Sequence, residues 1–194
     1  MLDIAQIVLW GITYLLIVYF MLKNRSKKIK AIPLLPVILN MSWEINALIE
    51  SNGFWGHIVW LGLDIFVFIC CTMCIKTIKN QVLYVLSLIP GTILLRFCFL
   101  LDKGMLMSVF AIDLIMAICF WVERKKLLTN GKVAIGITKL LGDLMAASYY
   151  APHHLLIIVI GIAVFCFNSA YVISAIKERN IIQQNSKIEG QSVP

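Results

Sequence analysis

The chain has 194 residues, of which 61% are hydrophobic and 14% are charged. Soluble domains carry about 25% charged residues, so this composition and a mean hydropathy of +0.91 exclude an ordinary soluble protein. The net charge of +7 comes without a pattern typical of nucleic-acid binding, and we expect the basic residues to face anionic lipid.

Seven apolar stretches follow one another along the chain, each close to the ~20 residues that a membrane-spanning helix needs. The first stretch opens with Asp3 and has neither a basic leader nor a small-residue cleavage site, so we expect it to remain as a span. The connections are short, which predicts a single all-α bundle of seven transmembrane helices over residues 1–179 and a disordered tail over 180–194. The predicted spans are 3–22, 31–50, 54–75, 82–101, 104–122, 133–151 and 154–176.

Basic residues alternate between the connections. All 17 of them except Arg96, Lys103 and Lys139 follow the first, third, fifth or last span. Because basic residues concentrate on the cytoplasmic side of a membrane, we predict an outside N-terminus and a cytoplasmic C-terminus. Lysine outnumbers arginine and isoleucine is frequent, which is typical of an AT-rich bacterial genome and favours a bacterial plasma membrane.

Acidic side chains interrupt four of these apolar stretches. An ionised carboxylate in such a place costs several kcal/mol, so these residues are the first candidates for function. At a rise of 1.5 Å per residue, the four acids and Arg96 lie about 8 to 14 Å inside the predicted outer boundary. This common depth predicts a shared cavity that opens outward or into lipid. The four acids are Glu44, Asp64, Asp113 and Asp143.

The acids outnumber the cations near them. We expect Arg96 to pair with one of the carboxylates, and Lys139 can reach Asp143 one turn later on its own helix. The remaining carboxyls are then expected to be protonated or to share protons, which is the condition for a proton donor or relay. Asn168, in the last stretch, is expected to form the floor of the cavity.

Glu44 lies beside Trp43 and one turn after Asn40. Two interpretations of Glu44 stay open: a helix-packing group paired with Arg96, or a carboxyl that apolar surroundings keep neutral and able to donate a proton. Trp43 and Trp60 are expected to lie deeper than an interfacial belt. Packing is their ordinary role, and stabilising a cation in the cavity is their functional one.

Metal and disulfide chemistry are not indicated. His57, His153 and His154 lie at the predicted outer interface, where a solvated role is expected, and their spacing matches no metal motif. The six cysteines lie in or at the ends of spans and suggest no disulfide framework. We therefore expect no metal and no cofactor.

Two segments, Ser42-Trp43-Glu44 and Trp60-Leu61-Gly62-Leu63-Asp64, resemble the small seven-span terpene cyclases of fungal meroterpenoid and indole-diterpene pathways and their bacterial relatives. The stretch 138–142 is similar to the sixth span of that family. The resemblance implies a membrane enzyme that cyclises a polyprenyl substrate, epoxidised in the fungal pathways, without a metal or cofactor. It also implies that Glu44 and a second acid in the final span manage the proton.

The position of that second acid is occupied here by Asn168, an amide that cannot act as an acid. Two interpretations stay open: the chain does not carry out the standard epoxide protonation, so that its substrate differs or its activity is lost, or the task passes to another carboxyl. The candidates are Asp143, Asp64 and Asp113.

Three classes of function remain open. An isoprenoid cyclase predicts a closed, aromatic-lined cavity around Glu44. A small proton-coupled transporter predicts a relay of acids and a second vestibule on the cytoplasmic side. A non-catalytic membrane protein, such as an immunity or assembly factor, predicts that every acid is paired directly and holds helices together.

Overall fold

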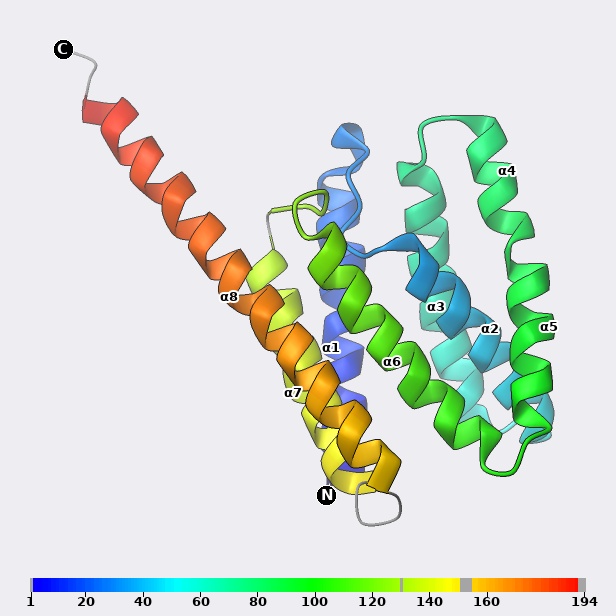
Figure 1. Cartoon of the computed structure of the whole chain (residues 1–194). Helices are drawn as coiled ribbons and strands as arrows, with labels where there is room; N and C mark the ends of the chain where they lie inside the picture. The colour runs from blue at the N-terminus through cyan, green and yellow to red at the C-terminus, as the bar shows by residue number, and fades with distance from the viewer. Residues whose placement is uncertain (1, 130, 151–154, 192–194) are drawn as a thin grey trace.

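The computed structural model describes residues 2–129, 131–150 and 155–191, and over these ranges its regular elements are all helices (Figure 1). The all-α prediction is therefore confirmed. In chain order the elements are α1 (Leu2–Lys23), the 3-10 turn η1 (Arg25–Lys27), α2 (Leu34–Glu50), α3 (Trp55–Cys74), α4 (Ile78–Leu86), α5 (Leu88–Phe99), α6 (Gly104–Glu123), α7 (Lys132–Tyr150) and α8 (Leu155–Gln191).

Five segments of the described chain are long and apolar enough to cross a membrane, which is compatible with an integral membrane protein. The other two predicted spans correspond to α2 and α7, which are more polar or shorter. Neighbouring helices cover both, because α2 packs against α3, α5 and α6, and α7 packs against α1 and α8. The five segments are Ile4–Lys23, Trp55–Cys74, Ile78–Phe99, Gly104–Glu123 and Leu155–Asn185.

The helices form two groups that share α6. On one side α1, α7 and α8 pack together, and on the other side α2 packs between α3 and α5 (Figure 1). Helix α6 contacts α8 in the first group and α2 and α5 in the second, while α1 contacts α3. These two connections bring the polar residues of both groups into the same bundle.

The predicted fourth span is built from two helices, α4 and α5, that meet at Ser87. Pro90 has no amide hydrogen to donate to a carbonyl one turn earlier, which weakens the helix at this point. Gly91 serves a different purpose. A Cβ atom there would lie 2.8 Å from Oγ of Ser42, so the glycine allows α5 to approach α2 closely.

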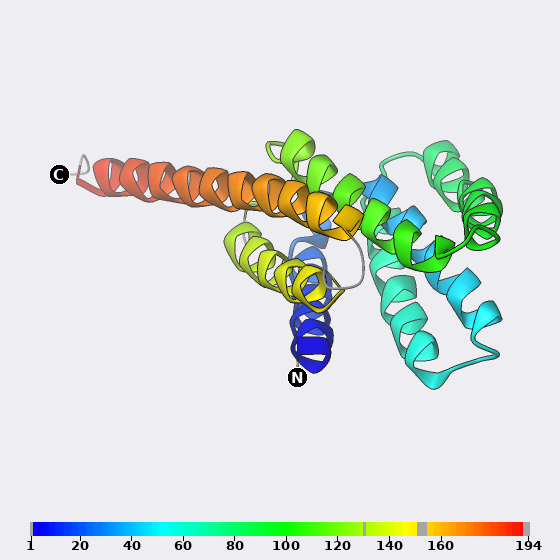
Figure 2. The ribbon, with the colours of Figure 1, turned by 60° about the horizontal axis from the view of Figure 1, so that its bottom comes forward.

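The last helix is longer than the sequence analysis predicts. Helix α8 continues to Gln191, so residues 180–191, expected as a disordered tail, are helical and extend beyond the bundle (Figure 2). Neither glycine nor proline occurs over residues 162–189, and a helix that has already begun adds each residue at little cost. Residues 192–194 of the predicted tail lie outside the described residues.

Replacing Gly91 with valine should destabilise the bundle by about 1–3 kcal/mol, because the new side chain overpacks the α2–α5 contact. The free energy of unfolding of the purified protein in mixed micelles measures this change. Gly62→Val is the matched control, because a Cβ atom at Gly62 meets nothing within 4 Å. Equal destabilisation by both variants would show that helix propensity, rather than the α2–α5 contact, sets the cost.

Candidate functional site

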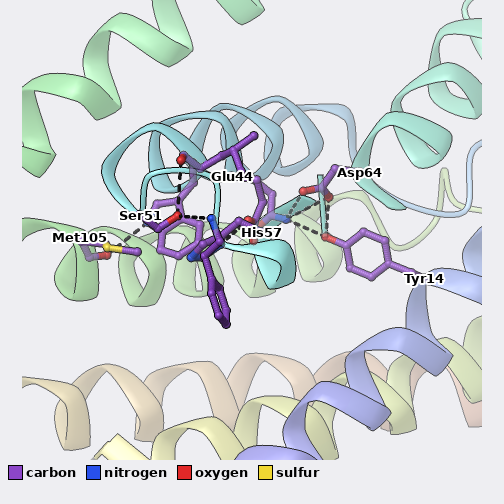
Figure 3. Close-up of polar contacts among 10 residues, drawn as sticks. Tyr14, Glu44, Ser51, His57, Asp64 and Met105 are labelled. Atoms are coloured by element: carbon purple, nitrogen blue, oxygen red, sulfur yellow. Dashed lines mark hydrogen bonds and ion pairs between the residues drawn. The ribbon is translucent and has the colours of Figure 1, made fainter. Parts of the chain in front are cut away.

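Glu44 and His57 form a pair across α2 and α3 (Figure 3). Oε2 of Glu44 lies 2.9 Å from Nδ1 of His57, and the Glu44 residue is only 7% exposed. His57 lies in the first turn of α3 and is half-buried. The expectation of a solvated role for His57 is therefore wrong. Since α2 and α3 form a hairpin, the ring connects a buried carboxyl with the exposed end of that hairpin.

Trp43 is fixed beside this pair. Its Nε1 donates to Oγ of Ser108 at 3.0 Å and to the carbonyl oxygen of Met105 at 3.2 Å, both on α6. Its ring meets those of His57 and Phe99 edge-on, with centroids 5.9 and 5.8 Å away. Trp43 is buried, as expected for a tryptophan deeper than an interfacial belt.

Asp64 is held by donors from two other helices. It is 1% exposed and accepts a hydrogen bond of 2.6 Å from Oη of Tyr14 on α1. Nδ2 of Asn40 on α2 lies 3.0 Å from each of its carboxylate oxygens. Figure 3 shows Tyr14 and Asp64 pointing toward one another. The ring of Trp60 packs edge-on against that of Tyr14, with 5.8 Å between centroids, and so supports the residue that donates to Asp64.

Tyr14 is the member of this site that sequence reasoning missed. Besides its hydrogen bond to Asp64, the phenol carries electrostatic interactions with Glu44 and Asp113. Its oxygen also accepts from Nδ2 of Asn40 at 2.6 Å, so the phenol joins α1 to both α2 and α3. The available signal was a pair of hydroxyl-bearing residues, Thr13 and Tyr14, near the middle of the first stretch.

A second group of polar residues joins α7 to α8. Asp143, 5% exposed, accepts at Oδ2 from Nζ of Lys139 at 2.5 Å and from Nδ2 of Asn168 at 2.6 Å. The predicted contact between Lys139 and Asp143 is confirmed. Lys139 also lies over the ring of Trp10, 5.2 Å from its centroid. Asn168 acts here as a donor to an acid rather than as the floor of a cavity.

Asp113 on α6 is half-buried and makes no hydrogen bond or ion pair with the described residues. It interacts electrostatically with Asp143 and Lys139. Among the described residues, hydrogen bonds therefore place the other three acids in separate polar groups, one with Glu44 and His57, one with Asp64, and one with Asp143.

Arg96 does not join these groups. Its Nη1 pairs with Oε2 of Glu50 at 2.8 Å, and both side chains are exposed, at 43% and 52%. The expectation that Arg96 pairs with one of the four acids is wrong. Arg96 occupies the last turn of α5, and from there its long side chain reaches the end of the bundle.

Two hollows in the described part of the chain lie away from the acids. One hollow of about 330 Å³ lies between α7 and α8, and another of about 240 Å³ lies between the ends of α1 and α3. Neither is lined by a residue that the sequence analysis assigns to the site. Hydrogen-bonded side chains instead occupy the space between the helices around Glu44, Asp64 and Asp143.

The chemistry of this region is that of carboxyls, amides, an imidazole and a phenol. Within the described part of the chain, no group of three or more His, Cys, Asp and Glu side chains is arranged to hold a metal. His153 and His154 lie outside that part. Carboxyl, imidazole and phenol groups donate, accept and relay protons.

No family model, curated protein or solved structure matches this chain.

Replacing Lys139 with methionine should destabilise the protein by about 3–5 kcal/mol, because it leaves the buried Asp143 without its cation. The double variant Lys139→Met/Asp143→Leu should recover most of this loss, since it removes both charges. Equilibrium unfolding in mixed micelles measures all three proteins. A double variant that is less stable than Lys139→Met would contradict a simple buried ion pair.

Proposed function

We propose that the chain is an integral membrane protein with seven spans, its N-terminus outside and its C-terminus in the cytoplasm. Five long apolar helices support the proposal, and α2 and α7 complete the set because their polar groups are covered by neighbours. The basic residues after α1, α3, α6 and the apolar part of α8 support the orientation. The composition favours a bacterial plasma membrane.

The orientation can be tested by labelling single cysteines in a cysteine-free background with a membrane-impermeant maleimide. Asp102→Cys, between α5 and α6, should react in intact cells. Lys126→Cys, between α6 and α7, should react only after the cells are permeabilised. The opposite pattern would reverse the orientation, and labelling of both in intact cells would contradict a span at α6.

Within this protein we propose an acid–base enzyme site in which Glu44 donates a proton to an apolar substrate. One observation carries the proposal: the buried Glu44 carboxyl has a half-buried histidine as its hydrogen-bond partner. An imidazole takes a proton at one nitrogen and releases one at the other. His57 can therefore pass protons from the exposed end of the α2–α3 hairpin to Glu44.

The reaction that we propose is proton-initiated cyclisation of an isoprenoid, as the sequence resemblance implies. Glu44 would protonate an alkene or epoxide, and the resulting carbocation would close rings before a carboxylate removes a proton, so that the substrate is isomerised. Asp64 is the candidate for that base, because it lies on α3, the helix that also carries His57 beside Glu44. The rings of Trp43, Phe99 and Trp60 would stabilise the cation, and the surrounding apolar helices would exclude water.

Neither of the two hollows described above borders Glu44. We propose that an isoprenoid reaches the pair from the bilayer by separating the helices around it. Helices α3 and α5 expose large apolar side chains on the surface, among them Phe66 and Phe97, and an isoprenoid dissolved in the bilayer would meet these first.

Glu44→Gln should lower product formation at least about 100-fold, because the amide keeps the shape of the side chain but has no proton to donate. Membranes containing the protein would be incubated with farnesyl- and geranylgeranyl-derived substrates, epoxidised and plain, and cyclised products identified by mass spectrometry. Glu50→Gln is the matched control, since Glu50 is exposed and pairs with Arg96 away from the site. It should retain product formation within about twofold.

Undiminished product formation by Glu44→Gln would remove Glu44 from the mechanism. Absence of product from every substrate would favour a second candidate, a non-catalytic membrane protein. That candidate has a specific observation behind it, since Glu44, Asp64 and Asp143 each bond directly to a side chain of another helix. A transporter has less support, because the hollow at the predicted cytoplasmic end contacts none of the four acids.

A further inference from the structure

A hollow of about 240 Å³ lies between the end of α1 and the end of α3. None of the four acids lines it. Residues from α1, η1 and α3 surround it, so it combines the last turns of two apolar helices with a basic connection. The lining residues are Met21, Leu22, Arg25, Ser26, Lys28, Cys70, Met73 and Cys74.

Two cations on its rim have no protein anion. The structure shows no hydrogen bond or ion pair from the side chains of Arg25 and Lys28 to the described residues, whereas nearby Lys30 pairs with Glu123 at 2.7 Å. The backbone of Lys28 is left-handed, with φ of 50°, and its amide donates to the carbonyl of Arg25. This tight turn brings both cations to the same hollow.

The wall of the hollow is apolar and faces the surface. Leu22 and Met73 are 49% and 50% exposed, while Met21 and Cys70 beneath them are buried. The membrane-length segments end at Lys23 and Cys74, so the cationic rim begins where the apolar surface stops. A ligand that matches both parts has an anionic head and an apolar chain.

We propose that this hollow binds an anionic phospholipid, with its phosphate between Arg25 and Lys28 and its acyl chain along Leu22 and Met73. Basic side chains next to a span attract anionic lipid, and the hydroxyl of Ser26 adds a donor to the phosphate. The exposed apolar wall distinguishes a lipid from a free phosphate ion, which would use only the rim. This inference does not depend on the proposed enzyme activity.

The experiment measures lipid binding to the purified full-length protein by native mass spectrometry, with phosphatidylglycerol and phosphatidylcholine as probes. The double variant Arg25→Gln/Lys28→Gln should bind phosphatidylglycerol about tenfold or more weakly than the unmodified protein. The charge-matched control is Lys76→Gln/Lys79→Gln, which removes two exposed lysines that do not line the hollow. It should bind within about twofold of the unmodified protein.

Three results would overturn the proposal. Equal losses in both double variants would indicate diffuse attraction to the basic end of the bundle. Equal binding of phosphatidylcholine and phosphatidylglycerol would remove the role of the anionic headgroup. Complete displacement of phosphatidylglycerol by millimolar inorganic phosphate would make the site one for a free anion. All of the altered residues are exposed, so thermal unfolding of both variants should match that of the unmodified protein.

Discussion

Carboxyls among apolar helices need donors from other helices, and this requirement holds the bundle together. A buried polar group without a partner costs several kcal/mol where water is absent. Asp64 meets the requirement by joining α3 to α1 and α2, through Tyr14 and Asn40. Asp143 meets it at Oδ2, which joins α7 to α8, whereas its buried Oδ1 has no hydrogen-bond partner among the described residues. The more polar helices α2 and α7 are accordingly those that other helices cover.

Each of the two helix groups holds its own buried acid. Tyr14 and Asn40 donate to Asp64, and Lys139 and Asn168 donate to Asp143. Carboxyls exceed basic groups among these buried side chains, so protons held by the carboxyls would balance the excess negative charge. Groups of this kind can store protons as well as bind helices together.

The acids differ in what their surroundings suit them to do. Asp64 and Asp143 each accept hydrogen bonds from two side chains, an arrangement that stabilises a fixed structure. Glu44 has His57 as its partner, and that ring reaches toward the exposed end of the α2–α3 hairpin. We therefore assign the donation of the proton to Glu44. The lipid hollow at the ends of α1 and α3 belongs to a separate function of the same bundle, contact with the membrane surface.

The sequence by itself determined the features that depend on local pattern. The length of the apolar stretches predicted the helices. The spacing of four residues between Lys139 and Asp143 predicted their contact, because residues at this spacing are neighbours on one helix. Tertiary structure decided the pairing of Arg96 with Glu50, of Glu44 with His57, and of Asp64 with Tyr14. Contacts between helices depend on the rotation and separation of each helix, and these are set by the packing of the whole bundle.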